Sequence, residues 1–144
     1  MWPVVAVLGT IALATSAAPV PAPLPPSSVA DSLAAPPPVA ALLQRACYDC
    51  HSEQSRWPWY ARVAPVSWLL ARDVREGRKQ VNFSRWNTYS PTTRRHKLQW
   101  MGRVIRNGSM PPLLYRVVHR DARLSANERA MLERWIAVEI AKTS

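Results

Sequence analysis

The stretch Cys47-Tyr48-Asp49-Cys50-His51 contains both cysteines of this 144-residue chain and one of its three histidines. On a helix, residues three and four positions apart lie on one face, so this spacing directs Cys47, Cys50 and His51 to the same side. A C-x-x-C-H sequence is the attachment pattern of c-type haem: two thiols form thioethers with the porphyrin, and the imidazole ligates the iron. We therefore expect one covalently attached haem c, with His51 as an iron ligand.

Three other interpretations of the two cysteines explain less. A thioredoxin-like pair belongs in a βαβ context, and the sequence shows no strand-like alternation. A zinc site needs a further ligand at finger-like spacing, whereas His96 and His119 lie far downstream and apart. A disulfide between Cys47 and Cys50 would be strained and would leave His51 without a role. Haem attachment accounts for all three residues of the motif.

A second iron ligand is expected from Asn107-Gly108-Ser109-Met110-Pro111-Pro112, a segment between two predicted helices. The soft thioether of a methionine favours ferrous iron and raises the potential of a haem that has a histidine ligand. The prolines restrict the backbone directly after Met110, which suits a ligand that must keep its position. His119 is the alternative ligand. We interpret Met101 as core packing and His96 as a surface residue.

Helix signals dominate the chain from Val39 onward, and residues 39–144 are predicted to be one domain. One helix is expected over Val39–Ala46, after three prolines, and a second over Val66–Lys79. A third begins at Ser90-Pro91, an N-cap followed by proline, and ends at Asn107-Gly108.

The last predicted helix begins at a capping box, Ser125-Ala126-Asn127-Glu128. Its expected apolar face consists of Met131, Leu132, Trp135, Ile136 and Ile140. Four helices joined by loops with proline and glycine predict an all-α fold. Because a domain of about a hundred residues buries little apolar surface, a cofactor is expected in its core. The expected fold is a small cytochrome c-like helical domain around the haem.

The first 38 residues differ from the rest in composition. The apolar run Val4–Ala14 is followed by Thr15-Ser16-Ala17-Ala18, a pattern typical of a secretory signal and its cleavage region. No Lys or Arg precedes the run, so an uncleaved membrane anchor and a misassigned start codon are the alternatives. Residues 1–18 are thus interpreted as a signal peptide or N-terminal anchor. Residues 19–38 are rich in Pro and Ala, and we expect a disordered linker with polyproline II character.

The charge is uneven as well. Nineteen Lys and Arg face nine Asp and Glu, which gives the chain a net charge of +10. The first basic residue is Arg45, so all nineteen cations belong to the predicted domain, whereas the acidic Asp31 precedes it. Such a domain attracts anionic partners in a salt-dependent way. An acidic redox partner protein or an anionic membrane surface is expected. Nucleic acid is not, because an exported haem protein does not meet it and the basic residues are scattered.

An aromatic cluster, Trp57-Pro58-Trp59-Tyr60, follows the haem motif. Its side chains are expected either to cover the porphyrin edge or to pack in an ordinary core. Arg56 and Arg62 flank the cluster. They are interpreted as exposed arginines, with neutralisation of the haem propionates as the alternative.

Three runs of the sequence resemble the bacterial haem-binding domain family of small c-type cytochrome-like proteins. They are CYDCHSEQSRWPWYARVAPVSWLLARDVREGRKQVNFSRW (47–86), NGSMPP (107–112) and HRDARLSANERAMLERW (119–135). The resemblance covers about residues 39–137. It implies that Cys47 and Cys50 attach the haem, that His51 is the proximal ligand and that Met110 is the methionine of the M-P-P loop. Such families often have His-Pro after that loop, whereas here Arg120 follows His119.

Taken together, these features predict an electron carrier rather than an enzyme. Two protein ligands on the iron would leave no coordination site for a substrate, so we expect single-electron transfer in the periplasm after haem attachment by the cytochrome c maturation machinery. The alternatives are a haem-based peroxidase or a redox or gas sensor with a labile sixth ligand, and a haem-bearing interaction module.

Overall fold

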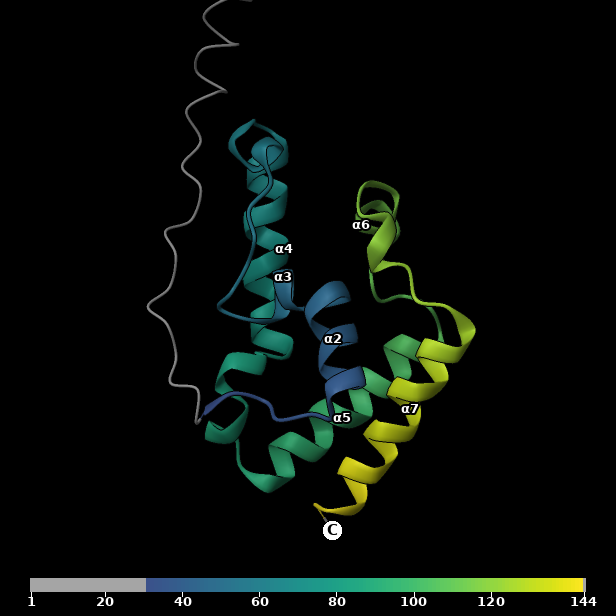
Figure 1. Cartoon of the computed structure of the whole chain (residues 1–144). Coiled ribbons are helices and arrows are strands. Elements are labelled where there is room, and N and C mark those ends of the chain that lie inside the picture. Colours follow the sequence, from purple (N-terminus) through teal and green to yellow (C-terminus); the bar gives the residue numbers. More distant parts are fainter. Residues whose placement is uncertain (1–30, 144) are drawn as a thin grey trace, which may run out of the picture.

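The described part of the chain, residues 31–143 of a computed structural model, is helical and contains no strand (Figure 1). The all-α prediction is therefore confirmed. The interpretation of residues 1–18, and of the linker up to residue 30, lies outside the described residues. The α-helices are α2 (Pro37–Ala46), α3 (Tyr48–His51), α4 (Val66–Gln80), α5 (Pro91–Arg106), α6 (Leu113–Val118) and α7 (Ala126–Ala141). The 3-10 turns are η2 (Trp59–Arg62), η3 (Phe83–Thr88) and η4 (Arg120–Ala122).

The four predicted helices are α2, α4, α5 and α7, and their local signals act as expected. The Ser90 hydroxyl accepts a hydrogen bond from the backbone N–H of Thr93 (3.2 Å) at the start of α5. The helix ends before Gly108, whose φ of 73° is a left-handed conformation that favours glycine. At the start of α7, Ser125 and Glu128 exchange both hydrogen bonds of a capping box. The short helices α3 and α6 are not among the predicted ones.

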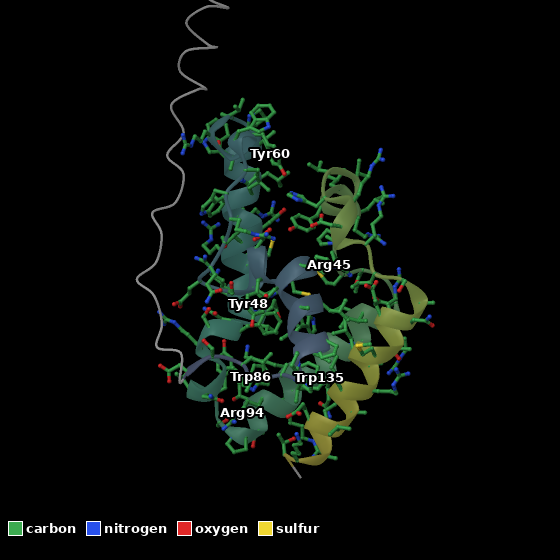
Figure 2. The ribbon with its side chains drawn as sticks, in the orientation of Figure 1. Arg45, Tyr48, Tyr60, Trp86, Arg94 and Trp135 are labelled. Atoms are coloured by element: carbon green, nitrogen blue, oxygen red, sulfur yellow. The ribbon has the colours of Figure 1, made fainter. Side chains whose placement is uncertain are left out.

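The core lies where α5 packs along α7 and α2 crosses them (Figure 1). The interpretation of Met101 as a core residue is confirmed, because its side chain is 4% exposed. Figure 2 shows Trp86 and Trp135 between the helices at this end of the molecule. The largest fully buried side chains of this core are Leu43, Val81, Leu98 and Leu132, at 1% exposure or less. Burial of this apolar surface supplies most of the driving force for folding.

The packed unit starts earlier than the predicted boundary at residue 39. The backbone N–H of Leu33 donates to the carbonyl of Phe83 (2.8 Å), and Leu33 and Ala35 pack against the core. Residues 33–38, which the composition assigns to the linker, thus contact the domain.

Two arms rise from the core on opposite sides of α2 and α3 (Figure 1). One arm is η2 with α4, and the other is the segment that carries α6. The Tyr60 hydroxyl lies 2.7 Å from Nε2 of His119 and joins the two arms, and Figure 2 shows the Tyr60 side chain at the far end of the first arm. Within residues 31–143, none of the helices combines the length and apolarity needed to cross a membrane.

Candidate haem-binding site

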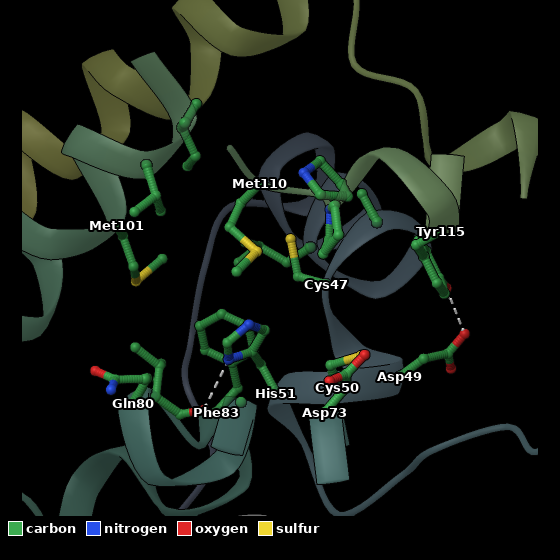
Figure 3. Close-up of a pocket in the computed structure, with 18 of the residues that line it drawn as sticks. Cys47, Asp49, Cys50, His51, Asp73, Gln80, Phe83, Met101, Met110 and Tyr115 are labelled. Carbon is green, nitrogen blue, oxygen red and sulfur yellow. Dashed lines mark hydrogen bonds between the residues drawn. The ribbon is translucent and has the colours of Figure 1, made fainter. Parts of the chain in front are cut away.

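An apolar cleft, drawn in Figure 3, lies between the two arms and is lined in part by residues of α5. Cys47, Cys50 and His51 enter it from the start and end of α3, as the spacing of the motif predicts. Met110 enters it from the turn after α5. Most of the remaining wall is apolar and includes Leu43, Val81, Phe83, Trp100, Val104 and Ile105. The structure therefore brings all four predicted site residues to one cleft.

The orientation of His51 follows from its hydrogen bond. Nδ1 lies 3.1 Å from the carbonyl oxygen of Val81, which can only accept, so Nδ1 carries the proton and Nε2 is left with a free lone pair. Burial lowers the pKa of His51, which favours this neutral form. The rings of Phe83 and Trp100 lie 6.0 and 6.2 Å from the imidazole, centroid to centroid, and confine it. A neutral imidazole with a free Nε2 is the form that ligates iron.

The two thiols are not joined in a disulfide. Burial, and then the proximity of Cys50, raises the pKa of Cys47 to about 12. Burial, and then Asp49 and Asp73, raises the pKa of Cys50 to about 11. A redox-active C-x-x-C pair instead needs a lowered thiol pKa. The surroundings of these thiols thus oppose the thioredoxin-like interpretation.

Met110 is held on a turn fixed to α5. Its backbone N–H donates to the carbonyl of Val104 (3.1 Å), and the preceding Ser109 hydroxyl donates to Oδ1 of Asn107 (2.8 Å). In Figure 3 the Met110 sulfur is directed into the cleft that contains the His51 ring. Two thiols, a neutral imidazole and a thioether within an apolar wall fit a c-type haem.

The other two histidines lie elsewhere. His119 stacks on the ring of Tyr115 (centroids 4.3 Å apart) and bonds to Tyr60, and it does not line the cleft. His96 is exposed on α5, so its interpretation as a surface residue is confirmed. Of the two candidate ligands opposite His51, only Met110 shares its cleft. Ligation of the iron by Met110 stays a prediction.

Comparison with known proteins agrees with this geometry. The family model of the haem-binding domain matches residues 6–138 of the chain. The chain belongs to the haem-binding domain family. It is also 26% identical over 107 residues to the cytochrome c peroxidase Ccp of Escherichia coli (strain K12), an alignment that covers 70% of this chain but only 22% of that protein. No solved structure gives a significant match.

Asp49 connects the haem motif of this haem-binding domain to the second arm. Its carboxylate accepts hydrogen bonds from the Tyr115 hydroxyl (2.8 Å) and from the backbone N–H (3.1 Å) and Nε (3.3 Å) of Arg56. Burial, and then the bond to Asp49, raises the pKa of Tyr115, which keeps its hydroxyl protonated as a donor. A single carboxylate inside the motif therefore holds α6 against α3.

A second carboxylate, Glu53, stabilises the segment that faces His51. Its side chain is 2% exposed and accepts hydrogen bonds from Asn82 (3.3 Å) and Arg85 (2.5 Å). Its backbone N–H donates to the hydroxyl of Ser84 (3.0 Å). These bonds fix residues 82–85, so the carbonyl of the adjacent Val81 is held at the imidazole.

The ionisable carboxylate side chains that line the cleft give it an acidic character, although the chain as a whole is basic. Asp49, Asp73 and Glu76 line the cleft, and no Lys or Arg among the described residues does. Arg56 and Arg62 are exposed and stand outside the lining, so their interpretation as exposed arginines is confirmed. Arg56 pairs with Asp49 at 3.3 Å instead of facing the cleft.

The aromatic cover of the cleft comes from residues that the sequence analysis did not select. None of Trp57-Pro58-Trp59-Tyr60 lines the cleft, and Trp59 is 80% exposed. Phe83 and Trp100 line the cleft instead. A signal for Trp100 exists, since Trp100 and Val104 form a second apolar pair at i, i+4 beside Met101 and Ile105.

Proposed function

We propose that this haem-binding domain carries one haem c, attached at Cys47 and Cys50, and transfers single electrons. The observation that supports the proposal is the meeting of two thiols, the His51 imidazole and the Met110 thioether in one apolar cleft (Figure 3). These side chains are a full donor set for a six-coordinate c-type haem. A bound haem supplies an iron that gains or loses one electron at a time.

The residues of the chain set the properties of such a site. The hydrogen bond from Nδ1 of His51 to Val81 fixes the ring orientation of the proximal ligand. The turn bonded to Val104 holds Met110 against a rigid helix, so its thioether keeps its place in both oxidation states. If His51 and Met110 both ligate the iron, no coordination site would remain for a substrate, and the haem would supply outer-sphere electron transfer.

Covalent attachment is expected to require catalysis. Attachment forms a thioether bond from each of the two thiols, and the C-x-x-C-H motif is the pattern at which haem c is attached. We therefore propose that the cytochrome c maturation machinery attaches the haem to Cys47 and Cys50.

Export to the periplasm is part of the proposal. It is supported by the apolar run Val4–Ala14 and by the location of that machinery beyond the cytoplasmic membrane. Residues 1–38 fused to alkaline phosphatase without its own signal should give active enzyme, which folds only after export. An inactive fusion that accumulates in the cytoplasm would contradict export.

Optical spectroscopy of protein matured in a bacterial periplasm tests the ligand set. The ferric protein should be low-spin, with a weak charge-transfer band at the red end of the visible range. Met110→Ala should lose this band, whereas Met101→Leu, a change in the same cleft, and His119→Ala should keep it. A high-spin spectrum of the unchanged protein would contradict the carrier. A low-spin wild-type spectrum without the band, which becomes high-spin in His119→Ala but not in Met110→Ala, would assign the ligand to His119.

Covalent attachment has a separate test. Acid-acetone should leave haem on the wild-type chain and remove it from the Cys47→Ser/Cys50→Ser variant. Haem that resists extraction from this variant would exclude thioether attachment at these cysteines.

A second candidate function is a haem-based peroxidase or a redox or gas sensor. It is favoured by the similarity to part of a protein named cytochrome c peroxidase. In that case Met110 is a labile ligand that peroxide or a diatomic molecule displaces. Cyanide binding to the ferric wild-type protein, at a rate close to that of Met110→Ala, would favour this function. Binding that is much slower in the wild type favours the carrier.

A further inference from the structure

Most exposed large apolar side chains of the described part lie in two short segments. Five of the ten are in residues 59–69 and four are in residues 113–118, and only Val138 lies elsewhere. We call these nine the apolar rim: Trp59, Val63, Val66, Trp68, Leu69, Leu113, Leu114, Val117 and Val118. Their exposed fractions range from 39% at Val66 to 80% at Trp59. Apolar side chains clustered in this way mark a contact surface.

Both halves of the apolar rim lie at the end of the molecule opposite the C-terminus (Figure 1). The first half covers η2 and the first turn of α4, and the second half is α6. The contact between Tyr60 and His119 at 2.7 Å joins them. The halves border the cleft, since Asp73 lines it from α4 and Tyr115 lines it from α6.

The charge of these segments has one sign. Residues 54–72 contain Arg56, Arg62 and Arg72 but no Asp or Glu, and residues 113–120 contain Arg116 and Arg120 but no Asp or Glu. All but Arg116 are exposed. The apolar rim is therefore accompanied by cations and fits an anionic surface with an apolar interior.

We infer that the apolar rim docks this domain on an anionic lipid bilayer. Tryptophan and leucine side chains that enter the interfacial region, with arginines beside them at headgroup level, are the composition of a membrane-surface site. The two halves protrude from separate arms on either side of a cleft. A fluid surface accepts both protrusions at once, whereas a protein partner would need a matching relief. The inference goes beyond the proposed function and does not depend on electron transfer.

The apolar run Val4–Ala14 agrees with this occupant. One membrane contact alone gives marginal, reversible binding, and stable attachment takes two. The run, as an uncleaved anchor, and the apolar rim would be two such contacts on one chain.

Binding of the full chain to vesicles tests the inference. Phosphatidylglycerol vesicles should sediment the protein at low salt, and phosphatidylcholine vesicles should sediment much less. Hydrogen exchange on the anionic vesicles should slow in residues 59–69 and 113–118 and stay unchanged in α7. Exchange locates the contact, so binding through the N-terminal run alone is distinguished from docking of the rim.

Matched variants separate the contribution of the apolar rim to vesicle binding from nonspecific adsorption of the protein. Leu113→Ser/Leu114→Ser should weaken partition about tenfold or more, because two leucines no longer leave water. Val138→Ser changes an exposed apolar residue outside the rim and should leave partition within about twofold. Arg62→Glu/Arg120→Glu should weaken binding to phosphatidylglycerol far more than Arg103→Glu/Arg134→Glu on α5 and α7, which changes the net charge equally. All of the substituted side chains are exposed, so the variants should fold like the wild type. Unchanged far-UV circular dichroism checks this.

Three outcomes would overturn the inference. The first is failure to sediment with anionic vesicles, which would leave an acidic protein as the occupant. The second is sedimentation without slower exchange at the two segments, which would assign binding to the N-terminal run. The third is protection of the two segments from exchange in the absence of vesicles that increases with protein concentration. This result would make a second copy of the chain the occupant.

Discussion

A Cβ atom at Gly77 would lie 2.7 Å from the carbonyl oxygen of Cys50, so α4 contacts the haem motif backbone to backbone. No side chain can be accommodated at this distance, and the obstructing atom is main chain, which cannot rotate away. The contact determines how closely α4 approaches α3. It therefore sets the width of the cleft between Cys50 and the wall formed by α4.

Gly77→Ala is expected to destabilise the domain by about 1–3 kcal/mol, because the added methyl group pushes α4 away from Cys50. Gly102→Ala is the matched control, since a Cβ there meets only a methyl carbon of Ile136 at 3.6 Å, an ordinary contact. Alanine is the better helix former, so this control should be neutral or slightly stabilising. Urea unfolding measures both. Equal stability of the two variants would contradict the backbone contact.

Tyr115→Phe is expected to lower stability by about 1 kcal/mol, because it removes a hydrogen bond to the carboxylate of Asp49. It should also speed hydrogen exchange in α6, which this bond holds against α3. Tyr60→Phe removes the bond to the imidazole of His119 and serves as the comparison. If exchange in α6 rose only in Tyr60→Phe, the link through Asp49 would not be what holds the arm.

The capping box of α7 should make stability depend on pH. The backbone N–H of Ser125, and then Arg45, lowers the pKa of Glu128 below its ordinary value. Because the folded pKa is below the unfolded one, this contribution is complete above a pH of about 4.3 and disappears as the pH falls through the folded pKa.

Glu128→Gln keeps the length of the side chain but does not titrate. The wild type should be more stable than this variant by about 0.5–1 kcal/mol near neutral pH, and the difference should shrink as the pH falls from 6 to 3. Urea unfolding across this range measures the difference. An increase of this stability difference on acidification would contradict the lowered pKa of Glu128.

Met110→His should keep the haem low-spin and lower its reduction potential, because imidazole favours ferrous iron less than a thioether does. Potentiometric titration followed by optical spectra measures the change. Met101→Leu, a change in the same cleft, is the control and should shift the potential little. An unchanged potential in Met110→His would mean that Met110 does not ligate the iron.

Local patterns in the sequence were sufficient for the helices and the haem motif. The spacing of Cys47, Cys50 and His51 requires only the pitch of one helix, and the caps at Ser90 and Ser125 involve neighbours three residues away. Such interactions do not depend on how distant elements pack. The fold class, the main helices and three of the four site residues therefore follow from the sequence by itself.

Only the tertiary structure decided which candidate lies opposite His51. Met110 and His119 are nine positions apart and follow the same helix, α5, yet packing places Met110 in the cleft and His119 against Tyr60 and Tyr115. Packing also exposes Trp59 and brings Phe83 to the imidazole. The physical reason is that exposure and long-range contact depend on which faces of distant helices meet, and the chemistry of a single residue does not contain that information.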